Sequence, residues 1–237
     1  MSKTITVYWA GFNEQVNFIN TNMWYSDPKN LFKDMVEQRV DNRDDTLFRC
    51  PAIRDKATNT YYFENQIPST VTFLHDGTLG WEGVTCKSVR DPSISGTKHI
   101  SFNLSWIFYT DEPLEASFTP PYFHKNSYLP DMTFPAAKFN IGSWFRPFNA
   151  EFMLWNADTK QVVLPSGMPL FYAEFHTDAN IKFQRFECTD KIAKYAMACT
   201  FTPKLLGRFK PLSERYDLFK RTRMNSAVMR EIKDNLI

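Results

Sequence analysis

The string His176-Thr177-Asp178 comes closest to a catalytic or metal-binding motif in this sequence. A His-x-Asp pair supplies two of the three ligands in the facial triad that binds iron in non-haem oxygenases. That triad needs a second histidine from further along the chain, and none follows His176. His75 or His124 would complete the set only if the chain order were unusual. We therefore predict no metal site, and we interpret His176 and Asp178, its only candidates, as residues of a turn that ends a strand.

Other enzyme signatures are missing from the sequence. It contains no Gly-x-Ser-x-Gly nucleophile turn and no glycine-rich phosphate loop, and the whole chain has eight glycines. The four cysteines form no Cys-x-x-Cys pair, so we expect reduced and mostly buried thiols. The string His75-Asp76-Gly77 has the chemistry of a hairpin turn. We predict no catalytic residue and no cofactor.

Charge is distributed unevenly along the chain. Residues 204–237 carry nine Lys and Arg against four acids, a net +5, within a total charge of +2. The preceding 203 residues therefore carry −3. Such asymmetry is typical of a segment that meets a charged partner. The cations for which we predict partner binding are Lys220, Arg221, Arg223 and Arg230.

Three interpretations of this basic segment remain open. Residues 204–237 could follow the phosphates of a nucleic acid while Tyr216 and Phe219 stack on its bases. The segment could instead be an amphipathic helix that docks with its aromatic side chains inward and its cations in solvent. The shared stripe of Leu212, Tyr216 and Phe219 favours this second interpretation. In the third, the segment docks onto an acidic partner, such as another subunit.

The hairpin at Arg146-Pro147 carries three aromatic side chains, Trp144, Phe145 and Phe148. If they are exposed, they form a contact surface for a partner. If they are buried, they belong to the core. We place Trp144 and Arg146 among the candidate partner-binding residues.

The composition, 43% hydrophobic and 16% aromatic, predicts a globular protein rich in strands. From Ile100 to Phe108, apolar side chains alternate with Ser101, Asn103 and Ser105, which is the period of a strand. Many short strands separated by turns predict a mainly β (α+β) protein with a β-sandwich, jelly-roll or β-clip-like body. The predicted strands cover 60–65, 70–75, 79–86, 99–110, 114–119, 137–141, 150–156, 161–164, 168–176 and 180–187.

Helices are predicted near both ends of the chain. Ser26-Asp27-Pro28 has the residues of a helix start, and we predict a helix over 28–39. Thr189 can cap a helix that runs to about Cys199, and a final helix breaks near Asn225-Ser226. We predict a single domain, in which a β-rich body (1–188) carries a C-terminal helical segment (189–237) packed on it or extending from it.

The segment 139–176 resembles the closing half of the β-clip fold of dUTPases and dCTP deaminases. The resemblance lies in the hairpin Ile141-Gly142-Ser143-Trp144 and in the corner Leu164-Pro165-Ser166-Gly167-Met168-Pro169, which leads into an apolar strand. It implies a fold that acts on nucleotides. This hairpin lacks the acid that activates water in those enzymes, with Glu151 the nearest carboxylate, and residues 114–123 lack their serine-bearing phosphate motif.

Residues 3–176 also resemble uncharacterised families of tailed phages and some bacteria. The shared features are the start Thr6-Val7-Tyr8-Trp9, the string Pro120-Pro121-Tyr122-Phe123 and the Arg146-Pro147-Phe148 hairpin. This resemblance implies a phage-encoded protein of unknown role and brings no functional residues.

The predicted function is a non-enzymatic assembly or interaction protein, with a β scaffold and a basic helical docking arm. One alternative is a β-clip- or cupin-like enzyme that acts on a nucleotide or uses a metal, and another is a nucleic-acid-binding protein. We expect a protein partner or self-association. No apolar stretch approaches the roughly 18 to 20 residues that a membrane-spanning helix needs, and the N-terminus lacks the pattern of a signal peptide. The expected location is cytoplasmic, meaning the host cytoplasm or the virion for a phage protein.

Overall fold

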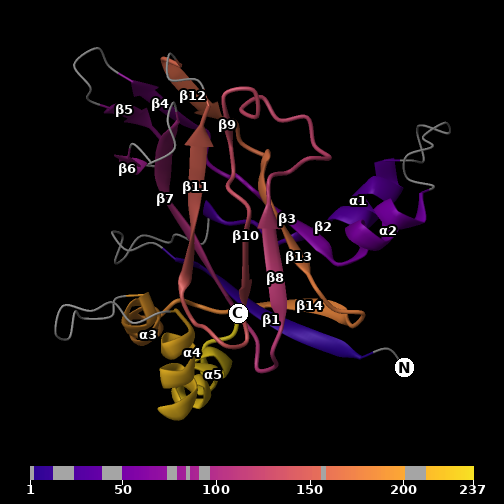
Figure 1. Ribbon diagram of the computed structural model, residues 1–237, viewed down its shortest axis with the longest axis vertical. Coiled ribbons are helices and arrows are strands. Elements are labelled where there is room, and N and C mark those ends of the chain that lie inside the picture. Colours follow the sequence, from indigo (N-terminus) through magenta and orange to yellow (C-terminus); the bar gives the residue numbers. More distant parts are fainter. Residues whose placement is uncertain are drawn as a thin grey trace.

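The computed structural model describes residues 3–12, 24–38, 50–73, 79–83, 86–90, 97–155, 159–200 and 212–237. It is mainly β with helices near both ends, as predicted (Figure 1). The elements in chain order are β1 (Thr4–Phe12), β2 (Lys29–Asn30), α1 (Leu31–Gln38), α2 (Pro51–Thr58), β3 (Thr60–Glu64), β4 (Ser69–Phe73), β5 (Leu79–Glu82), β6 (Cys86–Arg90), β7 (Lys98–Tyr109), β8 (Glu115–Thr119), β9 (Met132–Thr133), β10 (Ala137–Asn140), β11 (Pro147–Leu154), β12 (Gln161–Leu164), β13 (Pro169–Phe175), β14 (Asn180–Arg185), α3 (Asp190–Thr200), α4 (Leu212–Arg221) and α5 (Met224–Asp234).

The strands form three sheets. The six-stranded sheet has the order β14-β1-β7-β11-β9, with β6 also paired to β7. The five-stranded sheet has the order β10-β8-β13-β3-β2, and β12-β4-β5 form a small third sheet. All of these pairs are antiparallel except β1 with β14, which run parallel. The predicted sandwich-like body is therefore present.

Helices cover the outer faces of both larger sheets. Phe219 of α4 and Val228 and Ile232 of α5 are buried against β1 and β7 in one apolar cluster. On the five-stranded sheet, Leu31 and Met35 of α1 are buried in a second cluster. Figure 1 shows α3 to α5 and the α1–α2 pair on opposite sides of the strands. The molecule thus has four layers in the order helix, sheet, sheet, helix.

Strand β7 is buried on both of its faces. Every second side chain from Ile100 to Phe108 is apolar, and these side chains lie in the core between the sheets, as the pattern predicts. On the opposite face, Ile107 and Tyr109 are buried beneath the C-terminal helices. Ser101, Asn103 and Ser105 are buried too, although serine and asparagine alternating with apolar residues usually indicate a solvent-facing side.

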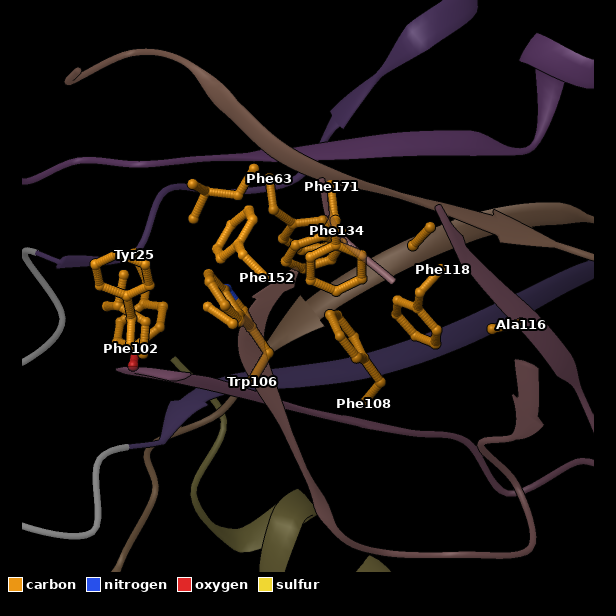
Figure 2. Packing of buried hydrophobic residues seen from close by; sticks show 14 of the residues in the cluster. Tyr25, Phe63, Phe102, Trp106, Phe108, Ala116, Phe118, Phe134, Phe152 and Phe171 are labelled. Carbon is orange, nitrogen blue, oxygen red and sulfur yellow. The ribbon is translucent and has the colours of Figure 1, made fainter. Parts of the chain in front are cut away.

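Aromatic rings fill the space between the two larger sheets (Figure 2). Phe171 of β13 stacks on Phe63 with ring centroids 4.9 Å apart and an interplanar angle of 14°. Trp106 packs edge to face on Phe171, with ring centroids 5.0 Å apart. Phe134 stacks on Phe171, with centroids 5.2 Å apart. Offset-stacked and edge-to-face pairs are the favoured geometries of aromatic quadrupoles. Phe171 therefore links side chains from strands of both sheets.

The predicted helices are present with small differences. The prediction 28–39 corresponds to β2 followed by α1. Thr189 caps α3 as expected, because its Oγ1 accepts a hydrogen bond from the Ile192 N–H at 3.3 Å. Helix α2 was not predicted, since its sequence carries little helical signal beyond Pro51 in the first turn.

The break in the C-terminal helix lies earlier than predicted. Helix α4 ends at Arg221, and Arg223 adopts a left-handed conformation with φ of 55° before α5 begins. Because Phe219 and Val228 must both face β1 and β7, the helical phase has to be reset between them. The turn at Thr222 and Arg223 performs this reset. No helix of the described residues is long and apolar enough to cross a membrane.

We expect Phe171→Ala to lower the free energy of unfolding by about 3 to 5 kcal/mol, because it removes a fully buried ring from the aromatic core. Urea denaturation would measure the change. Trp155→Ala is the control, since 49% of that side chain is exposed, and it should cost about 1 kcal/mol or less. Equal costs for the two variants would contradict the packing described for Phe171.

Candidate functional site

A polar pocket of about 420 Å³ opens beside α2 and the end of β13. Lys56 of α2 and Glu174 of β13 line it together with His176 and Asp178, the two residues that the sequence singled out. His176 and Asp178 are both exposed and lie in the connection between β13 and β14, as the turn interpretation predicts. The pocket thus gathers charged side chains from a helix, a strand and a turn.

Ser117 of β8 lies within hydrogen-bond distance of His176. Its Oγ is 2.7 Å from Nε2 of the imidazole. Strand pairing places Ser117 beside Glu174 of β13 on one side and Lys138 of β10 on the other. A serine hydroxyl hydrogen-bonded to a histidine is the first requirement of a nucleophile activated by a base.

The position of His176 is fixed by the turn that carries it. The Asn59 Nδ2 donates to the carbonyl oxygens of Thr177 at 2.5 Å and Ala179 at 3.2 Å. The Ala179 N–H donates to Thr177 Oγ1, and the His176 N–H donates to the Glu115 carbonyl oxygen. Together with these two hydrogen bonds from backbone N–H groups, the side chain of Asn59, at the end of α2, therefore holds the His-x-Asp segment.

Two ion pairs flank the Ser117–His176 pair. Lys56 Nζ and Glu174 Oε2 are 2.5 Å apart, and the hydrogen bond from this ammonium to Glu174 raises the pKa of Lys56. Lys138 Nζ and Glu115 Oε2 are 2.6 Å apart. The hydrogen bond from Lys138 lowers the pKa of the Glu115 carboxyl. Each of the two carboxylates therefore faces an ammonium, and the paired Glu115 carboxyl favours its ionised form.

The arrangement allows a proton to move between Ser117 Oγ and His176 Nε2. Among the described residues, no group of three or more His, Cys, Asp or Glu side chains is placed to hold a metal ion. In this part of the chain, His176 and Asp178 therefore gain no third ligand. The chemistry that the geometry supports is nucleophilic or acid–base chemistry at the serine.

A second polar cluster lies beneath α1. His124 Nδ1 is 2.6 Å from the Tyr172 hydroxyl, and His124 Nε2 is 3.5 Å from Asp34 Oδ2. Because the Phe123 N–H donates to the same hydroxyl, that hydroxyl can donate its proton to Nδ1, which leaves the Nε2 proton for Asp34. The Tyr62 ring packs on the imidazole at 4.8 Å. This network ties α1 to β3 and β13.

Burial is the main influence on the ionisation of His124. It lowers the pKa of the imidazole, and Asp34 and Glu64 act in the opposite direction. Burial also raises the pKa of the Tyr172 and Tyr62 hydroxyls, with Asp34 adding to the effect on Tyr62. A neutral imidazole and neutral phenols are therefore the forms that the folded cluster favours.

The predicted partner-binding cations gather on the C-terminal helices. Lys220, Arg221, Arg223 and Arg230 are all exposed, and we call them the cationic surface. None of the four forms an ion pair with a described residue, whereas Lys191 of α3 pairs with Glu231 of α5. Phe219 of α4 is buried beneath this surface, and Tyr216 packs edge to face on Trp144. The aromatic side chains thus point inward and the charges outward.

Trp144 and Phe145 are buried in the cluster beneath α4 and α5, and Phe148 packs against the core between the sheets. Trp144 is 3% exposed, so the interpretation of this hairpin as core describes it better than a contact surface does. Arg146 is exposed. The partner-binding roles of Trp144 and Arg146 stay predictions.

The cysteines were expected to be reduced and mostly buried, and one described cysteine differs. Cys50 is free and exposed, and not buried. Cys188 is free and half-buried, and burial raises the pKa of its thiol to about 12. The side chains of Cys86 and Cys199, and the predicted turn at His75-Asp76-Gly77, lie outside the described residues.

The sequence did not indicate that Ser117, Lys56 and Glu174 lie beside His176. The alternation of Glu115, Ser117 and Thr119 shows that these side chains share one face of β8. Yet Ser117 and His176 are 59 residues apart in the chain. Only the pairing register of β8 with β13 brings them together, and that register cannot be read from either strand alone.

No family model matches the chain, and no curated protein matches it either. The resemblances to phage families and to the β-clip therefore stay predictions.

We expect the stability of the protein to fall as the pH drops through about 6.5, the ordinary pKa of histidine. The folded state lowers the pKa of His124, so the unfolded state binds the proton more tightly and acid favours unfolding. Urea denaturation between pH 8 and pH 5 would measure the slope. His124→Gln should flatten it. His176→Gln, which leaves His124 in place, is the control, and an unchanged slope in His124→Gln would contradict the assignment.

Proposed function

We propose that this protein is a non-enzymatic interaction protein that binds an acidic protein surface, a second copy of itself included, through the cationic surface of α4 and α5. One observation carries the proposal. Lys220, Arg221, Arg223 and Arg230 are all exposed, and none of them forms an ion pair with a described carboxylate. A surface rich in unpaired cations steers association with a surface of the opposite charge.

The cationic surface stands on a firmly packed support. Phe219, Val228 and Ile232 are buried against β1 and β7, and Leu236 pairs with Phe186 as an isolated bridge. Because these helices are already packed, the backbone that carries the charges loses little conformational entropy when they meet a partner. The helical segment therefore docks on its own β body and offers its outer side to a partner.

The surface suits a protein better than a single-stranded nucleic acid. Stacking on bases needs exposed rings, yet Phe219 is buried and Tyr216 packs on Trp144. Leu218, by contrast, is 41% exposed on α4, one helical turn before Arg221. An exposed apolar side chain beside an arginine is typical of a protein interface. Residues 1–203 carry a net charge of −3, so another copy of the chain is a chemically suitable partner.

The triple variant Lys220→Glu/Arg221→Glu/Arg223→Glu should weaken binding about tenfold or more, because each change replaces attraction by repulsion. Light scattering after size exclusion would report self-association at low and high salt. Fluorescence anisotropy would report binding of a labelled polyglutamate peptide and of a single-stranded DNA oligonucleotide.

The control Lys125→Glu/Lys160→Glu/Lys182→Glu changes the net charge equally at exposed positions away from these helices and should bind like the wild type. The proposal would be overturned if the wild-type protein is monomeric and does not bind the polyglutamate peptide. Preference for DNA with a steep salt dependence would instead support the nucleic-acid alternative.

The contact between Ser117 Oγ and His176 Nε2 favours one second candidate, the enzyme alternative, in the form of a hydrolase. In such an enzyme His176 would accept the serine proton while the oxygen attacks an electrophilic carbon or phosphorus, and would pass that proton to the leaving group as its bond breaks. Water would then release the group bound to the serine. Lys56 and Glu174 line the adjoining pocket and would orient a polar substrate.

The second candidate predicts that a fluorophosphonate reagent labels Ser117 in the folded protein, which peptide mass spectrometry would locate. Ser117→Ala should remove the label. His176→Gln should slow labelling about a hundredfold, since it removes the base. Ser127→Ala, at an exposed serine outside the pocket, is the control. Labelling no faster than that of the urea-unfolded chain would eliminate this candidate.

A further inference from the structure

A seam separates the two larger sheets where the chain passes from β10 to β11. Strand β10 is the last strand of the five-stranded sheet. Strand β11 pairs with β9 only at Met153 and Leu154. From Pro147 to Phe152, that edge of β11 therefore faces no other described strand. The pairing of β11 with β7 also shifts register between Asn149 and Glu151, which bends this part of the strand.

A cavity of about 280 Å³ occupies the seam. Its apolar lining comes from Phe139 and Phe148, with Phe134 behind them. The Phe139 and Phe148 rings lie 6.0 Å apart at an interplanar angle of 36°, and Phe134 lies 5.5 Å from Phe148. Phe139 and Phe148 are only partly buried, so the aromatic core reaches the surface here. A planar apolar group is the shape that such rings accept.

The charges at the mouth of the cavity leave one cation uncompensated. Lys138 is paired with Glu115, and Glu151 lies 3.4 Å from His99. Arg146 also lines the cavity, and it forms no ion pair with any residue that the structure describes. A guanidinium in this position can bind a carboxylate through two parallel hydrogen bonds.

Tyr216 of α4 adds a hydroxyl to the same mouth. Burial raises the pKa of this phenol, and the nearby Arg146 guanidinium acts in the opposite direction. The phenol therefore stays protonated and can donate a hydrogen bond beside the guanidinium. Together the two side chains provide donors for an anion at one end of an aromatic cavity.

We propose that the seam between β10 and β11 binds a small organic carboxylate with a planar apolar body, such as a free aromatic carboxylate. Its carboxylate meets Arg146 and Tyr216, and its ring packs on Phe139 and Phe148. The cavity lies at the lower end of the volumes of small-molecule sites, which limits the ligand to a compact one- or two-ring compound. This site does not depend on the proposed function of the cationic surface.

Isothermal titration calorimetry with 2-naphthoate and its neutral counterpart 2-naphthamide tests the proposal. We expect the wild-type protein to bind naphthoate at least about tenfold more tightly than naphthamide, since a hydrogen bond to a charged group contributes roughly that factor or more. Arg146→Gln should remove this preference and leave the binding of naphthamide intact. Arg146 is exposed, so this substitution leaves the core unchanged.

Two further variants make the result specific. Ala137 is an exposed residue that lines the cavity, and Ala137→Trp should weaken both ligands by filling the space. Arg54→Gln removes an exposed arginine of α2 outside the cavity and should bind both ligands like the wild type. The proposal is overturned if naphthoate does not bind at millimolar concentration. It is equally overturned if Arg146→Gln and Arg54→Gln weaken binding to the same extent.

Discussion

The packing of aromatic rings between the two larger sheets is the interaction on which the rest of the structure depends. Phe171 contacts Phe63, Trp106 and Phe134, so that β3, β7 and β13 share a single core (Figure 2). Flat rings can fill a broad gap between twisted sheets with few side chains. Phe118 of β8 belongs to the same core, and the register of β8 with β13 brings Ser117 to His176.

The two outer faces of the sandwich have different consequences for chemistry. The face of β1 and β7 carries apolar side chains that three helices cover, and the exposed side of those helices presents cations. On the other face, α1 and α2 leave polar side chains of β8 and β13 open beside a pocket. The seam between β10 and β11 offers a third environment, where the aromatic core itself meets solvent. Each environment follows from how completely one layer covers the next.

The strands could be predicted from the sequence because alternation is a local property. Ile100 to Phe108 shows it clearly, and the structure places those side chains in the core. The burial of Ser101 and Asn103 could not be predicted, since it depends on what lies over the outer face of β7. Likewise His176 was recognised as a residue of interest, but its partner Ser117 was not, because strand order and register decide which distant residues become neighbours. Helix α2 shows the remaining limit, since its short pattern is weak beside the strong pattern of β3.

The parallel pairing of β1 with β14 also determines the order in which the chain can fold. Strand β1 lies between β7 and β14, so one of its two neighbours is synthesised more than 160 residues after it. Until Asn180 to Arg185 have left the ribosome, one edge of an apolar strand stays without its partner. Contacts this distant in sequence slow folding, and an unpaired strand edge promotes aggregation in the meantime. The sheet that supports α3 to α5 is therefore completed only late in synthesis.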